Sequence, residues 1–93
     1  MKICHNKEYK EANKKINKVY KKLMKMLDKV GKQKLRKSER AWIKYRDANS
    51  EFKADMARGG TMEGLLYTNS EIYMIRERTK ELESIVKELE YYK

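Results

Sequence analysis

The chain contains no proline, only four glycines and a single cysteine among its 93 residues. Proline and glycine are the residues that tight turns use most, so their scarcity argues against a β-sheet protein with many hairpins. Charged residues make up 41% of the chain and apolar residues 40%, which is typical of amphipathic helices. At this length the sequence predicts a single all-α domain over residues 1–93.

Long apolar runs are absent as well. No stretch reaches the roughly 18 apolar residues of a membrane-spanning helix, so a transmembrane segment is not expected. Residues 1–10 also lack the apolar core of a secretory signal peptide. From the residues alone, we expect either a cytosolic protein or a mature domain from which a leader has been removed.

Apolar residues recur at alternating spacings of three and four, which is the period of an amphipathic helix. The pattern predicts helices over about residues 6–30, 32–57 and 62–91, with Gly31 ending the first and Thr61 capping the third. Short connections predict an elongated antiparallel three-helix bundle, up-down-up, with coiled-coil-like packing. Such a rod exposes much surface for its volume, which leaves a homodimer open. The middle helix is expected to pack through Leu35, Trp42, Tyr45, Phe52 and Met56.

Positive charge is concentrated in the first third of the chain. Residues 1–37 hold 14 Lys+Arg against 3 Asp+Glu, whereas residues 38–93 hold 10 against 11. Lysines on adjacent helical rows opposite the apolar stripe form either an ordinary solvated face or a surface for an anionic polymer, membrane surface or acidic protein. No nucleic-acid-binding motif accompanies them, so nucleic acid is not an expected partner. The candidate cationic face consists of Lys14, Lys15, Lys18, Lys21, Lys22 and Lys25.

Residues with catalytic or metal-binding chemistry are few. His5 is the only histidine and follows the only cysteine, Cys4. Two residues are too few ligands for a metal site, and no base or orienting partner accompanies the thiol. Isolated acids on solvated helix faces do not form a general acid–base pair. The sequence therefore predicts no enzyme, no metal and no cofactor.

Three segments together carry a family resemblance: residues 16–20, 39–48 and 59–61, preceded by Cys4 and followed by Arg78 with Leu82. In order and spacing they resemble the LprI-like lysozyme-inhibitor family of small bacterial envelope proteins over nearly the entire chain. The tryptophan with the Arg-Asp pair is the most specific part. The signature residues are Asn17, Tyr20, Trp42, Arg46, Asp47, Gly59, Gly60 and Arg78.

The resemblance implies a non-enzymatic protein-binding domain in the periplasm or cell envelope. The residues themselves leave the cytoplasm as the alternative location. The domain's partner would be a cell-wall hydrolase such as a lysozyme. Because many lysozymes are basic, contact requires a locally acidic surface. The third helix, with 7 Asp+Glu against 5 Lys+Arg from Glu63 onward, is the candidate. The alternative function is a cationic module that contacts an anionic envelope polymer, membrane surface or acidic protein through the first helix.

The resemblance also implies cysteines where this chain has Ser50 and Ser70. Both are missing together, as expected of disulfide partners, so we predict that the two serines face each other. Cys4 keeps a family cysteine position, and its expected partner lies outside this chain. We expect Arg46, Asp47 and Arg78 to form an inter-helix ion-pair network, with Trp42 packed between helices.

Overall fold

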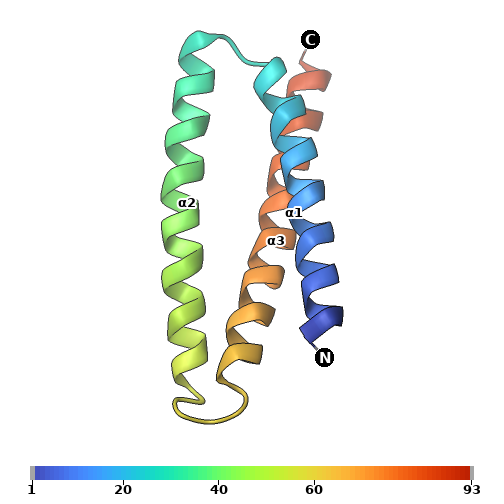
Figure 1. Cartoon of the computed structure of the whole chain (residues 1–93). Helices are drawn as coiled ribbons and strands as arrows, with labels where there is room; N and C mark the ends of the chain where they lie inside the picture. The colour runs from blue at the N-terminus through green and yellow to red at the C-terminus, as the bar shows by residue number, and fades with distance from the viewer. Residues whose placement is uncertain (1, 93) are drawn as a thin grey trace.

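A computed structural model describes residues 2–92, with side chains from Lys7 onward, and contains three helices (Figure 1). They are α1 (Lys2–Lys25), α2 (Lys29–Asp55) and α3 (Glu63–Tyr91), which run up-down-up. Within residues 2–92 there is no strand. The molecule is elongated, with extents of 51 × 23 × 17 Å. The predicted all-α antiparallel architecture is therefore confirmed.

The middle position in the bundle belongs to α3. It packs along both α1 and α2, whereas α1 and α2 have almost no direct contact with each other. Figure 1 shows α2 and α3 close together at the turn that joins them and separating toward the α1–α2 connection. The three helices thus form a row with α3 at its centre.

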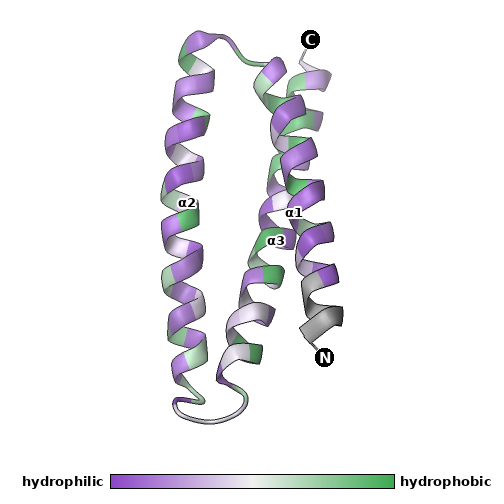
Figure 2. Ribbon diagram, viewed as in Figure 1, coloured by the Kyte–Doolittle hydropathy of each residue, from purple (hydrophilic) through white to green (hydrophobic). Residues whose placement is uncertain are grey.

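The hydrophobic core lies mainly between α1 and α3. It is built from side chains at helical spacing, with half-buried residues such as Leu35 and Trp42 of α2 packed against it. Figure 2 shows how few hydrophobic residues α2 carries among its hydrophilic ones. The buried members of the core cluster are Ala12, Ile16, Leu23, Ile75, Leu82 and Val86.

The first connection lies earlier in the chain than the sequence pattern predicted. α1 ends at Lys25, and Gly31 lies in the first turn of α2 instead of ending α1. Asp28 provides the reason, because its carboxylate accepts a hydrogen bond of 2.8 Å from the backbone N–H of Gly31. A side-chain cap of this kind satisfies an N–H that has no partner within the helix. It therefore starts α2 before the glycine.

The second connection, residues 56–62, confirms one expectation and contradicts another. Gly59 has a φ of 77°, in the left-handed region that favours glycine, as expected at the end of a helix. Thr61 does not cap α3. The N-cap residue is Met62, whose side chain makes no capping hydrogen bond. The acidic Glu63 in the first turn offers a favourable charge instead.

The apolar stripe predicted for α2 is divided between two faces. Leu35 and Trp42 pack against the core as expected. The face toward α3 continues through polar and small residues, including Ser50 and Ala54, which are 0% and 6% exposed. The large apolar residues in the second half of α2 and at its C-cap are instead exposed: Tyr45 (62%), Phe52 (68%) and Met56 (74%). The prediction for these three was wrong because, in this part of the chain, the apolar residues that recur at helical spacing lie on a face that does not pack against α3.

Two further expectations concern membranes and metals. No helix in the described part of the chain is long and apolar enough to cross a membrane. Over the same residues, His, Cys, Asp and Glu side chains form no group of three that could hold a metal ion. The side chains of Cys4 and His5 lie outside those that the structure describes.

Candidate functional site

Three signature residues, Trp42, Arg46 and Arg78, meet between α2 and α3. The guanidinium carbons of Arg46 and Arg78 lie 5.3 Å and 5.9 Å from the centroid of the Trp42 ring. The two arginine side chains are only 14% and 11% exposed. Trp42 itself is half-buried and packed against the core, so its expected place between helices is confirmed. The ring attracts both cations through its π face.

Arg46 connects α2 to α3 through a buried ion pair. Its Nε lies 3.1 Å from Oε1 of Glu71, which is 4% exposed, and its Nη2 lies 2.9 Å from Oδ1 of Asp47. Burial lowers the pKa of Arg46, but the hydrogen bond to Asp47 and the charge of Glu71 outweigh it, so the pKa is raised. The guanidinium is therefore held firmly in its charged form.

Glu71 is the most deeply buried charged side chain of this cluster. Burial raises its pKa above the ordinary value, although the hydrogen bond from Ser50 and the charge of Arg46 act in the opposite direction. Ser50 Oγ donates that hydrogen bond to Glu71 Oε2 at 2.7 Å. The pKa rises because the cost of burying the Glu71 carboxylate is larger than the stabilisation that Ser50 and Arg46 give to its charged form.

Arg78 provides a second bridge between α3 and α2. Its Nε donates to Glu39 Oε1 at 3.1 Å and its Nη2 to Ser38 Oγ at 3.0 Å. It also pairs with Glu81, one turn further along α3. The expected ion pairs of Arg46, Asp47 and Arg78 are thus present, and two of these residues reach across the helix interface.

Ser50 and Ser70 lie directly opposite each other in the same interface. Their Oγ atoms are 3.1 Å apart and hydrogen-bonded. The prediction that these two residues face each other is therefore confirmed. Together with the buried Glu71 they form a polar cluster between α2 and α3.

The other signature residues lie elsewhere. Asn17 is exposed on α1, and Tyr20 packs half-buried against the α1–α3 core. Gly59 and Gly60 belong to the turn between α2 and α3. The structure brings together Trp42, Arg46, Asp47 and Arg78, and adds Glu39, Ser50 and Glu71.

The lysines of the candidate cationic face are all exposed on α1. Lys22 pairs with Glu90 of α3 at 3.7 Å, and Lys15 lines a groove between α1 and α3. The other four form no ion pair with any described side chain: Lys14, Lys18, Lys21 and Lys25.

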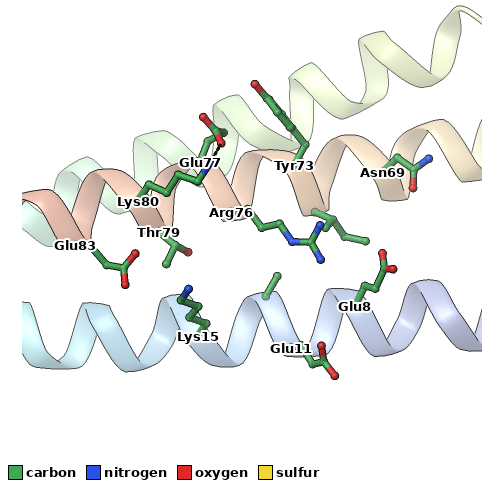
Figure 3. A pocket seen from close by; sticks show the side chains of 12 residues that line it. Glu8, Glu11, Lys15, Asn69, Tyr73, Arg76, Glu77, Thr79, Lys80 and Glu83 are labelled. Atoms are coloured by element: carbon green, nitrogen blue, oxygen red, sulfur yellow. Dashed lines mark hydrogen bonds and ion pairs between the residues drawn. The ribbon is translucent and has the colours of Figure 1, made fainter.

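That groove, here called the α1–α3 groove, has a volume of about 630 Å³ (Figure 3). In Figure 3, Glu8 and Lys15 reach from α1 toward α3, while Arg76 and Glu83 reach from α3 toward α1. Its lining residues are Glu8, Glu11, Ala12, Lys15, Asn69, Ile72, Tyr73, Arg76, Glu77, Thr79, Lys80 and Glu83. A small apolar floor is therefore surrounded by charged side chains of both signs.

The acidic side chains of the groove are the part that sequence reasoning missed. Glu8 and Glu11 are the only acidic residues of α1, and the fold brings both to the groove that Glu83 of α3 also lines. None of these three pairs with another described side chain, whereas Glu77 pairs with Lys80 at 2.9 Å. The acidic surface is thus not confined to α3.

Comparison with known proteins identifies the family. The family model described as "Lysozyme inhibitor LprI" matches residues 1–82. The chain belongs to the LprI family. An uncharacterized protein of Rhizobium meliloti (strain 1021) is 30% identical over an alignment that is 103 positions long. The alignment covers 97% of this chain and 74% of that protein. No solved structure matches the chain.

In this LprI-family chain, a disulfide between positions 50 and 70 is expected to form readily. The change Ser50→Cys with Ser70→Cys, in a Cys4→Ser background, should oxidise in air, because the Oγ atoms are only 3.1 Å apart. Closing a loop of about 20 residues should raise the free energy of unfolding by about 3 kcal/mol. Loss of the Ser50–Glu71 hydrogen bond offsets part of this gain. Urea unfolding with and without a reductant measures the gain.

The single variant Ser50→Cys in the same background is the control for this LprI-family disulfide. It has no partner thiol within the chain and should show no reductant-dependent change in monomer stability. Two free thiols in the double variant after air oxidation would show that the backbone cannot reach disulfide geometry.

Proposed function

We propose that this chain is a non-enzymatic inhibitor that binds a cell-wall hydrolase such as a lysozyme, in the periplasm or elsewhere in the cell envelope. The observation that carries the proposal is the match of the lysozyme-inhibitor family model to residues 1–82.

The signature cluster is a poor contact surface. Arg46 and Arg78 are largely buried and already paired with Glu71 and Glu39. Removing them from these partners to reach a hydrolase would leave buried carboxylates without a cation, which is costly. We therefore assign the cluster to the α2–α3 interface and look for the contact on the surface.

The proposed contact surface is the α1–α3 groove. A chain with a formal net charge of +10 is repelled by a basic hydrolase at long range. Binding then requires local carboxylates that receive basic side chains of the partner. Glu8, Glu11 and Glu83 line the groove without ion pairs to other described residues, so they are available for this contact. α3, the contact helix expected from the sequence, contributes one wall.

A second candidate function rests on α1. Lys14, Lys18, Lys21 and Lys25 are exposed and form no ion pair within the described part of the chain. Such a row attracts an anionic envelope polymer, membrane surface or acidic protein, and the attraction weakens as salt rises. This alternative uses a different set of residues from the groove, which makes the two functions separable.

Charge reversal in the groove is expected to weaken inhibition strongly. Glu8→Lys with Glu83→Lys should weaken inhibition of a basic lysozyme at least about tenfold, because like charges across an interface repel. Reversal of the four α1 lysines to glutamate should leave inhibition intact or strengthen it. Inhibition of lysis of bacterial cell walls, measured across a series of inhibitor concentrations, gives the comparison.

A matched control separates local from overall charge. Glu63→Lys with Glu88→Lys changes the net charge equally at exposed sites outside the groove, and it should retain most of the inhibition. Equal loss in both double variants would contradict the groove as the contact. Absence of lysozyme inhibition by the wild type, together with salt-sensitive binding to an anionic polymer that the lysine reversal removes, would favour the cationic function.

A further inference from the structure

A stripe of apolar side chains on α2 is uncovered in the monomer. Its members recur at spacings of four, three, four and four, the spacing of a helix–helix seam. α3 occupies a different face of α2, the one that carries Trp42 and Ser50. The members of this α2 stripe are all exposed: Ala41, Tyr45, Ala48, Phe52 and Met56.

The α2 stripe matches itself when two copies run antiparallel. With the twofold axis beside Ala48, Tyr45 of one copy lies level with Phe52 of the other, and Ala41 lies level with Met56. Aromatic rings then meet in two equivalent pairs, a favourable contact beyond their buried area. The two copies of Ala48 meet at the centre, where small side chains allow the helices to approach closely.

Charges beside the α2 stripe also match in this arrangement. Lys44 and Glu51 are seven residues apart and so lie on the same flank of the helix, with Asp55 one turn further. At a rise of about 1.5 Å per residue, Lys44 of one copy lies only about 3 Å along the axis from both Glu51 and Asp55 of the other. Symmetry repeats these attractions at the other end.

The distribution of charge along α2 selects the antiparallel direction. Residues 29–40 carry six basic and one acidic residue, whereas residues 41–55 carry three of each. Parallel helices would place the two basic halves side by side and would be repelled. Antiparallel helices that overlap through residues 41–56 place the basic halves at opposite ends of the dimer.

We propose that two copies of this chain associate through the α2 stripe as an antiparallel, twofold-symmetric dimer. The seam of 16 residues is about 24 Å long, and one helix face of this length is a small contact beside the roughly 800 Å² per partner of a standard interface. The dimer is therefore weak, with a dissociation constant on the order of 100 µM. The proposal is independent of the inhibitor function, since the α1–α3 groove lies on other helices.

Sedimentation equilibrium of the wild type over concentrations up to about 1 mM tests the association. We expect the mass to rise from monomer toward dimer. Phe52→Glu should raise the dissociation constant at least about tenfold, because it places a carboxylate against an aromatic ring twice in each dimer. Tyr73→Glu is the matched control, an exposed aromatic on α3 outside the α2 stripe, and it should leave the dimer intact. Circular dichroism verifies that both variants fold.

Cross-linking tests the register. In a Cys4→Ser background, Ala48→Cys should form an intermolecular disulfide in air, whereas Lys18→Cys, on the exposed side of α1, should not. Lys44→Glu should weaken the dimer, and adding Glu51→Lys should recover part of the loss. A wild type that stays monomeric at about 1 mM, a dimer unaffected by Phe52→Glu, or equal cross-linking at positions 18 and 48 overturns the proposal.

Discussion

Replacing Arg46 by alanine is expected to lower the free energy of unfolding by about 3–5 kcal/mol, the usual cost of breaking a buried ion pair from one side. Arg46 is the cation closest to Glu71, with Nε and Oε1 3.1 Å apart, and its guanidinium also lies over the Trp42 ring. Without it the Glu71 carboxylate stays buried with only the hydrogen bond from Ser50. Urea unfolding followed by circular dichroism measures the loss.

The pH dependence gives this prediction a second readout. Because burial raises the pKa of Glu71, the folded chain holds that proton to a higher pH than the unfolded chain. The associated stability is fully present below the unfolded value, about 4.3, and is lost as pH rises through the folded pKa. Arg46→Ala removes a cation that lowers this pKa, so its defect should be largest near neutral pH and shrink on acidification. Adding Glu71→Gln should remove that dependence.

Arg58→Ala is the matched control for Arg46→Ala. Arg58 also pairs with a carboxylate, that of Asp55 at 2.7 Å, but both side chains are exposed. An exposed pair contributes little, because water already solvates both charges. A loss at Arg58 as large as that at Arg46 would show that burial of the α2–α3 cluster is not the source of the effect.

Trp42→Ala is expected to lower the free energy of unfolding by about 3 kcal/mol, the lower end for large aromatic truncations because the ring is only half-buried. The ring packs against the core and lies beneath two guanidinium groups. Its removal leaves space at the α2–α3 interface and takes away both cation–π contacts. Denaturant unfolding at micromolar protein concentration, monitored by circular dichroism, measures the change.

Tyr45→Ala provides the comparison for Trp42→Ala. Tyr45 is an aromatic residue three positions further along α2, but its side chain faces solvent. In the monomer, Tyr45→Ala should lower the free energy of unfolding only slightly. If Trp42→Ala unfolds at the same denaturant concentration as the wild type, the tryptophan does not support the helix interface and instead serves as a surface anchor for a partner.

The helices and their order could be predicted from the sequence because the α1 and α3 stripes keep a regular helical period. Two details could not. The boundary at Asp28 depends on a single side-chain hydrogen bond to Gly31, which periodicity does not detect. The packed face of α2 carries the polar residues Arg46 and Ser50 in place of apolar ones, so hydrophobicity pointed toward Tyr45 and Phe52 on the wrong face.

The residues of the site that could be predicted are those that belong to a recognisable sequence pattern. Trp42 with Arg46 stood out as a block, and the family resemblance placed Ser50 opposite Ser70. Glu71 gave no such signal, because an isolated glutamate on a helix is normally solvated. Its burial follows only from the packing of α3 against α2. The role of Glu8 in the groove could not be predicted either, because this glutamate lies in a lysine-rich helix whose charge pattern indicates a cationic surface.

The central place of α3 has a consequence for how the molecule opens. Because α1 and α2 contact each other so little, either outer helix can detach while the other stays docked on α3. Amide hydrogens of α1 and of α2 can therefore exchange with solvent through two separate local unfolding events. Those at the centre of α3 require loss of both interfaces and exchange last. The central helix thus sets the global stability, while each outer helix keeps its own smaller barrier to release.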